Sequence, residues 1–202
     1  MNYKFIREQV LKLLNQYSVA GSQVDSDYNN QMDYLQKIPA LTNDAMLEIA
    51  TTVRRIPSVV RLADLDAEDI GKELRYALPE DFYQFKSGDV VKTDDGKILH
   101  TNRYSLYGKN YLVVPKDEVG EYSITYYRYP KLLDEVPADD DELDNTVETH
   151  FAIPFYVASF LVSQDDAFLC ALFNNKYEDK LSKMIPDISA EIDTVQDVYG
   201  FN

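Results

Sequence analysis

Many enzymes use histidine, cysteine and paired acidic side chains as catalytic residues or metal ligands. In this sequence these residues do not have the spacing that such sites require. Its two histidines, His100 and His150, have no second histidine or cysteine at the spacing of a zinc site. Its single cysteine, Cys170, falls on the apolar side of an expected helix, which is typical of a small core residue. Glycine-rich phosphate loops, HExxH and GxSxG are all missing from the sequence. We therefore expect no enzyme activity, no catalytic residue and no zinc.

One stretch has part of the pattern of a calcium loop. Residues 25–30 read Asp-Ser-Asp-Tyr-Asn-Asn, with oxygen-bearing side chains spaced as in the first half of such a loop. However, Asn30 occupies the position that needs glycine, and Gln36 the position that needs a bidentate glutamate. The acidic run from Asp139 to Asp144 lacks metal-binding spacing too, and it indicates a solvated loop that caps the following helix. We expect no metal and no cofactor.

The charge balance narrows the classes of partner. The chain carries 35 acidic against 20 basic side chains, a formal net charge of -15. Binding to a nucleic-acid backbone requires clustered Lys and Arg, so wrapping of DNA or RNA is disfavoured. An acidic surface can still surround DNA without binding it, because its negative charge repels the phosphates. The alternative is that the acidity only supports solubility.

The elements that organise the chain begin with its longest apolar run, Phe151 to Val162. A membrane span needs roughly twenty residues, so this shorter run predicts a buried helix of a soluble domain. Pro154 predicts either a kink or a helix start delayed towards Ile153, where proline is tolerated. Residues 163–166 then break the run and cap a second helix, which completes a helical hairpin. The expected apolar stripe of this second helix comprises Phe168, Leu169, Leu172, Phe173, Tyr177, Leu181 and Met184 or Ile185.

The amino-terminal quarter of the sequence predicts three helices. Apolar residues recur at helical spacing over 5–17, and Gly21 with Ser22 ends that run. A second helix is expected over 26–38, before Pro39, and a third over 42–53.

Between these helices and the hairpin, the sequence changes to short runs rich in Val, Ile and Tyr, which predicts strands. Asp94-Asp95-Gly96 and Gly108-Lys109-Asn110 are typical of tight hairpin turns. The last of these runs, 121–129, carries aromatic residues on both faces. This indicates that one face packs on the core and that the other contacts something else. The expected strands are 56–62, 73–78, 82–85, 90–93, 97–100, 103–107, 111–114 and 121–129.

Together these patterns predict an α+β protein that is mainly a helical bundle, with a small antiparallel β module inserted into it. Residues 1–55 and 131–185 are expected to form the bundle from the three amino-terminal helices and the hairpin. Residues 56–130 are expected to form the β module. Residues 186–202 form the third region, a carboxyl-terminal arm with a short tail helix.

Several stretches, taken in order, form a recognisable series: 10–19 with Gly21, 33–35, 49–51, 78–82, 111–115, 126–130, the acidic stretch ending in Glu142-Leu143, and 154–158 with Asp165-Asp166. In this order they resemble the head-tail connector proteins of tailed bacteriophages, also called head completion or portal adaptor proteins. The resemblance covers nearly the whole chain, and its motifs are structural rather than catalytic. The long β segment departs from the smaller members, which look all-helical.

This resemblance implies a structural virion protein of the neck, at the junction of head and tail. Its subunits are expected to form a homo-oligomeric, dodecameric ring that docks on the portal protein and binds a downstream neck or tail protein. DNA would pass through the lumen without specific binding, and no membrane is involved. The amino terminus lacks an apolar signal core, so we expect synthesis in the host cytoplasm. An acidic DNA-mimic inhibitor and a small enzyme of unfamiliar type are the alternatives.

Two sets of residues are expected to make the contacts of such a ring. Tyr127 and Tyr129, on the strand with aromatic residues on both faces, are expected at the lateral interface. Pro186 ends the preceding helix, and a short amphipathic helix with an aromatic end follows it. We expect this arm to reach the portal or a neighbouring subunit, the alternative being that it folds back on its own bundle. Its contact residues are Ile188, Ile192, Val195, Val198, Tyr199 and Phe201.

Overall fold

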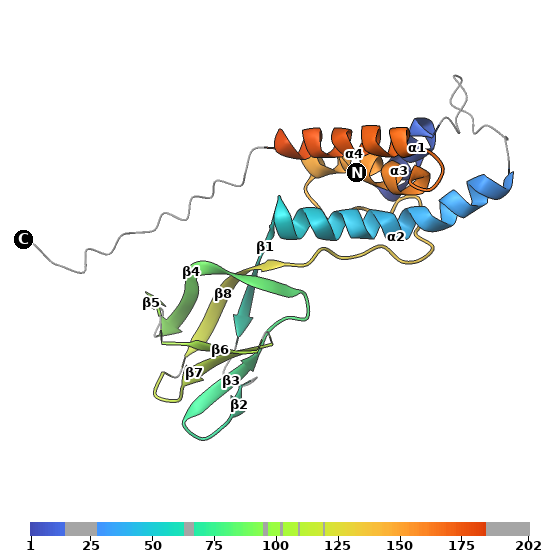
Figure 1. Ribbon diagram of the computed structural model, residues 1–202. Coiled ribbons are helices and arrows are strands. Elements are labelled where there is room, and N and C mark those ends of the chain that lie inside the picture. Colours follow the sequence, from blue (N-terminus) through green and yellow to red (C-terminus); the bar gives the residue numbers. More distant parts are fainter. Residues whose placement is uncertain are drawn as a thin grey trace, which may run out of the picture.

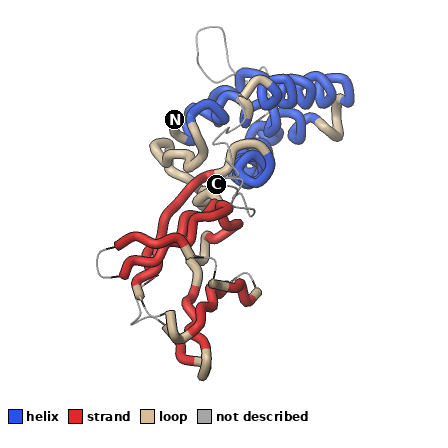
Figure 2. The backbone as a smooth tube through the Cα atoms, turned by 90° about the vertical axis from the view of Figure 1, so that its left-hand side faces the viewer, coloured by secondary structure: helices blue, strands red, loops and turns tan. Residues whose placement is uncertain are grey.

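The computed structural model describes residues 1–14, 28–62, 67–94, 97–101, 103–108, 110–118 and 120–184. Helices and strands occupy opposite ends of the molecule, as Figure 1 and Figure 2 show. We call the two parts the helical unit and the β module. The helical unit contains α1 (Tyr3–Leu13), α2 (Tyr28–Thr52), the 3-10 helix η2 (Val147–Phe151), α3 (Ile153–Val162) and α4 (Ala167–Ser182).

The apolar run that the sequence marks as central forms α3. This helix packs against α1, α2 and α4, and it lies between α2 and α4 in Figure 1. Ile153, Val157 and Ala158 are fully buried. Pro154 lies in the first turn, where its missing N–H costs no helical hydrogen bond, so the expectation of a delayed start is confirmed.

The expectation that the acidic loop caps the helix after it is wrong: the N-cap residue of η2 is Thr146, which forms no side-chain capping bond, and the loop instead caps α1, the first helix of the chain. The backbone N–H groups of Tyr3 and Lys4 donate to the carbonyl oxygens of Asp141 and Asp139, at 2.8 and 3.1 Å. Arg7, one turn further along α1, forms an ion pair with the Asp139 carboxylate. The first N–H groups of a helix have no partner within it, so these bonds satisfy α1 from a segment distant in sequence.

The second and third expected helices are one helix, α2, and the expected break at Pro39 is wrong. Proline removes one hydrogen bond from a helix interior but does not end it when packing holds both sides. Here Ile38, Met46 and Ile49 are fully buried in the same core. The Thr42 hydroxyl donates to the carbonyl of Ile38 at 2.7 Å, next to the gap that proline leaves. The first half of α2 bends relative to the remainder (Figure 1).

The β module is larger than the sequence indicates, so the expectation of a mainly helical bundle with a small β module is wrong. In the described part of the chain, eight strands form two four-stranded antiparallel sheets, in the orders β1-β8-β4-β5 and β2-β3-β7-β6. The protein is α+β, with one main core in the helical unit and one in the β module. The strands are β1 (Ile56–Leu62), β2 (Glu68–Asp69), β3 (Glu73–Ala77), β4 (Phe82–Asp94), β5 (Lys97–His100), β6 (Ser105–Tyr107), β7 (Tyr111–Pro115) and β8 (Glu121–Arg128).

Local turns and long-range pairing both shape these sheets. The pairs Asp94 with Lys97 and Tyr107 with Tyr111 confirm the two expected hairpins. Two expected strands, 82–85 and 90–93, are one strand, β4, whose register shifts twice against β8. The inner faces of the two sheets meet in a core of apolar and tyrosine side chains: Leu62, Tyr76, Leu78, Phe82, Val90, Leu112, Val114, Tyr122, Ile124 and Tyr126.

The segment after β8 returns along α2 to the helical unit (Figure 1). One side chain fastens it: the Asn43 amide donates to the carbonyl of Leu133 at 2.9 Å and accepts from its N–H at 2.8 Å. An extended backbone has no hydrogen bonds of its own, so this paired contact substitutes for a strand neighbour. The Asn145 amide similarly donates to the Met46 carbonyl, at 3.0 Å.

Replacing Asn43 by alanine tests this fastening. The variant Asn43→Ala leaves both backbone groups of Leu133 without their partner, so we expect the free energy of unfolding to fall by about 1–3 kcal/mol. Urea unfolding followed by circular dichroism measures the loss. Asn175→Ala, at an exposed position of α4, is the control and should stay within about 0.5 kcal/mol of the parent. Equal stability of the two variants would contradict the assignment.

Candidate interaction surfaces

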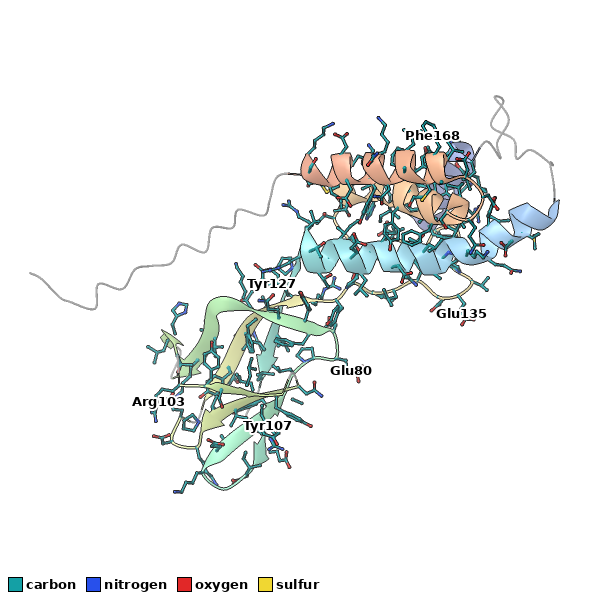
Figure 3. The ribbon with its side chains drawn as sticks, in the orientation of Figure 1. Glu80, Arg103, Tyr107, Tyr127, Glu135 and Phe168 are labelled. Carbon is teal, nitrogen blue, oxygen red and sulfur yellow. The ribbon has the colours of Figure 1, made fainter. Side chains whose placement is uncertain are left out.

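The two tyrosines expected at a lateral ring interface both have neighbours within the chain. Tyr127 is 8% exposed, and the Arg55 guanidinium carbon lies 5.2 Å from the centre of its ring. Tyr129 is half-buried, with its ring centre 5.1 Å from that of Tyr83. Figure 3 shows Tyr127 at the end of the β module that faces the helices. The interface role of both residues stays a prediction, and Tyr127 has little surface left for a neighbour.

An ion pair connects the β module to the segment that leads back to the helices. Arg128, the last residue of β8, donates from both terminal nitrogens to the Asp144 carboxylate, one of them at 2.8 Å. The N–H of Lys131 donates to the same carboxylate at 2.7 Å. The hydrogen bonds from Arg128 hold the pKa of Asp144 below its usual range, against the opposing effect of burial. The carboxylate therefore fixes the direction in which the chain leaves the sheet.

Further polar contacts lie within the β module beside this junction, and one crosses to the helices. Tyr126 donates its hydroxyl to the Asp81 carboxylate at 2.9 Å, and the Asp81 carbonyl accepts the N–H of Tyr129 at 2.8 Å. From the β module, the Tyr83 hydroxyl donates to the carbonyl of Thr51 near the end of α2, at 3.4 Å. Hydrogen bonds and charges, rather than a shared apolar core, hold the two parts at this point.

The junction predicts a pH-dependent stability. A carboxyl with a lowered folded-state pKa stabilises the fold above its unfolded value of about 3.9, and this contribution is lost as pH falls through the folded value. Asp144→Asn should therefore lower the free energy of unfolding by about 1–3 kcal/mol at pH 7, because the substitution removes hydrogen bonds to a charged carboxylate. The difference from the parent should shrink below about pH 4.

Urea unfolding at several pH values measures this dependence. The matched control is Asp140→Asn, because Asp140 is exposed and forms no ion pair with another residue in the described ranges. The control should follow the parent at every pH. A difference for Asp144→Asn that does not change with pH would show that the carboxylate charge is not what stabilises the junction.

An exposed apolar surface lies on the helical unit. Phe168 of α4 is 76% exposed, and Leu172, one turn further along, is 40% exposed. Figure 3 shows Phe168 at the outer edge of the helices, away from the β module. The sequence placed both residues in the buried stripe of this helix, and that expectation is wrong. The buried stripe is Phe173, Tyr177 and Leu181, which lies roughly 160° around the helix from Phe168 and Leu172, on nearly the opposite side.

Beside the hairpin, a cleft of about 640 Å³ separates the first half of α2 from the end of α3. Phe160, which is 50% exposed, lies on its wall. Charged groups also line it, among them Asp33 and Lys37, which pair with each other. The cleft is lined by Asp33, Tyr34, Gln36, Lys37, Ala40, Leu41, Phe160, Leu161, Ser163, Gln164 and Asp165.

His150 and Cys170, two of the residues that the sequence analysis considered for chemistry, are packed inside the helical unit. His150 is 1% exposed, its Nε2 lies 2.9 Å from the carbonyl oxygen of Asn145, and burial lowers its pKa. Cys170 packs against the small core between α1, α3 and α4, as expected. No group of three or more His, Cys, Asp and Glu side chains in the described ranges is arranged to hold a metal ion.

The expected contact residues of the carboxyl-terminal arm lie outside the described residues. These are Ile188, Ile192, Val195, Val198, Tyr199 and Phe201. The first half of the calcium-like stretch, 25–27, also lies outside them.

Comparison with known proteins adds no family. No protein-family model matches the chain. No curated protein matches it either. Among the helices of the described residues, none has the length and apolar character needed to cross a membrane.

Proposed function

We propose that this chain is the subunit of a ring-shaped head-tail connector, which binds beneath the portal of a tailed phage and links the capsid to the tail. The observation that carries the proposal is the exposed apolar surface of α4. Phe168 and Leu172, which are 76% and 40% exposed, lie on one side of a helix whose opposite side is buried. Contiguous apolar surface of this kind is typical of protein contact sites.

A closed ring explains why such a surface persists on a chain that is otherwise strongly charged. In cyclic assemblies each subunit binds its neighbour through two different patches, so one apolar patch needs a complementary region elsewhere on the same chain. The cleft beside Phe160 supplies a concave region on the same helical unit. Helix-to-helix contacts between neighbouring subunits would bury the apolar side chains and leave the β module outside them.

The acidic excess has a place in the same proposal. A formal charge of -15 on each subunit gives a ring a strongly negative surface, which repels a DNA backbone. A lumen of that sign lets DNA pass during packaging and ejection without sticking to the protein. Under this proposal the protein acts at the neck of the virion, with the portal and a downstream neck or tail protein as partners.

Charge insertion into the apolar surface tests the ring. Phe168→Asp combined with Leu172→Asp should abolish cyclic assembly with a portal protein, because two carboxylates would be desolvated in the contact. The double variant should keep the unfolding free energy of the parent to within about 0.5 kcal/mol, since both positions are exposed. Negative-stain electron microscopy of portal mixtures and mass photometry measure the assembly.

The control adds the same charge elsewhere: Asn174→Asp on α4 combined with Thr146→Asp before η2, both at exposed positions. The control should assemble as the parent does. If the parent forms no cyclic assembly with or without portal, the proposed function fails. If the Phe168 and Leu172 variant still assembles, the ring uses another surface.

Deletion of 187–202 tests the docking arm. The described core ends with Leu181 and the half-buried Met184, so the truncated chain should stay folded and soluble. It should no longer bind portal in a pull-down or in surface plasmon resonance. Unchanged affinity would place the docking residues elsewhere, and an unfolded product would show that the arm belongs to the core.

A further inference from the structure

The outer face of the second sheet carries an arginine between two tyrosines. The guanidinium carbon of Arg75, on β3, lies 4.9 Å from the ring centre of Tyr107 and 5.1 Å from that of Tyr111. The strand register explains the arrangement, because Tyr107 on β6 is paired with Tyr111 on β7, and Arg75 is paired with Val113 on the same strand. Val113 is 4% exposed although it is not part of the core between the sheets.

Polar groups of this cluster remain open to a ligand. An Arg75 terminal nitrogen lies 3.4 Å from the Glu68 carboxylate, which is a long contact, and Glu68 is 65% exposed. The Arg75 side chain is 24% exposed and its Nε is buried, so a ligand can meet the exposed part of the side chain but not the Nε. Tyr107 is 63% exposed. The cluster therefore presents donors and an acceptor side by side, next to an exposed aromatic ring.

A cleft of about 380 Å³ adjoins this cluster and shares Tyr111 with it. A backbone hydrogen bond from Leu78 to the carbonyl of Asn110, at 2.8 Å, joins its two walls. The side chains of Glu80 and Asn110 form no hydrogen bond or ion pair with any residue that the structure describes. Figure 3 shows Glu80 and Tyr107 on the same side of the β module. The cleft is lined by Ala77, Leu78, Pro79, Glu80, Phe82, Asn110 and Tyr111.

The composition of this surface discriminates between classes of ligand. Arg75 is opposed by the Glu68 carboxylate, and Glu80 lines the adjoining cleft, so the positive charge available to a phosphate or another anion is offset. A purely apolar ligand would cover polar groups without pairing them, which costs free energy. A neutral ligand with many hydroxyl groups avoids both costs, because each hydroxyl both donates and accepts.

We infer that Tyr107, Arg75, Glu68 and the cleft beside Tyr111 form a saccharide-binding site. The C–H faces of a sugar ring pack on tyrosine, and its adjacent hydroxyls pair with the guanidinium and the carboxylate. The free amide of Asn110 and the carboxylate of Glu80 bind the hydroxyls of a second sugar unit in the cleft, whose volume lies in the range of small-ligand pockets. This inference does not rest on the proposed connector function, because the site is on the β module.

Binding of three trisaccharides to the full-length protein tests the inference: maltotriose, cellotriose and the trimer of N-acetylglucosamine. Saturation-transfer NMR detects binding, and titration calorimetry measures the affinity. We expect at least one of them to bind, and both Tyr107→Ala and Asn110→Ala to weaken it at least tenfold. Both residues are exposed, so both variants should keep the thermal unfolding midpoint of the parent. Phe168→Ala removes an exposed aromatic ring at the other end of the molecule and should leave the affinity unchanged.

Three outcomes overturn the inference. The first is that no trisaccharide binds at millimolar concentration. The second is that binding is the same in the parent, Tyr107→Ala and Asn110→Ala. The third is that the parent self-associates through this face, with Tyr107→Ala monomeric and no sugar bound, which would make the surface a contact between copies. Ring assembly is measured separately, so failure here leaves the connector proposal standing.

Discussion

The helical unit depends on covering a helix that is apolar on almost every side. A helix with one apolar stripe needs a single neighbour, but α3 buries seven of its ten residues and needs several. Helices α1, α2 and α4 surround it, and they come from both ends of the chain. The amino-terminal helices therefore cannot complete their core before the hairpin is present. The segments that precede and follow the β module in sequence must pack against each other in the helical unit.

The two cores meet through polar contacts. The helical core centres on residues such as Ile153 and Met46, the β core on residues such as Tyr76 and Ile124, and no side chain belongs to both. Between them stand the Arg128–Asp144 ion pair and the hydrogen bond from Tyr83 to the carbonyl of Thr51. Polar contacts depend on direction and distance more strongly than apolar packing does, so they define an orientation of the β module. They also stabilise less per unit of surface, which leaves each core to provide its own stability.

What the sequence predicts well is local, and what it misses is set by distant partners. The ends of β1 and β5 and the cap of α4 by Asp166 follow from alternation, turn residues and capping, all readable within a few positions. The helix through Pro39 depends on packing of Ile38 and Met46 against α3, far along the chain. β2 consists of two exposed acidic residues that carry no strand pattern. The pairing of Arg75 with Tyr107 and Tyr111 arises only once β3, β6 and β7 are neighbours.

The tyrosines show why aromatic content alone is a poor guide to contact surfaces. Tyr126 and Tyr177 are buried with their hydroxyls bonded to Asp81 and Glu48, so each ring serves a core while its polar end reaches a carboxylate. Aromatic residues on both faces of β8 indicated an external partner, yet one face meets the other sheet and Tyr127 on the other lies under Arg55. In the described part of the chain, the most exposed phenylalanine and tyrosine rings include Tyr107, at a sheet edge, and Phe168, on the side of its helix opposite the buried stripe. Phe168 sits on a helix whose opposite side is fixed in a core, and Tyr107 is held by the pairing of β6 with β7. A preformed aromatic surface is what a partner can bind without ordering it first.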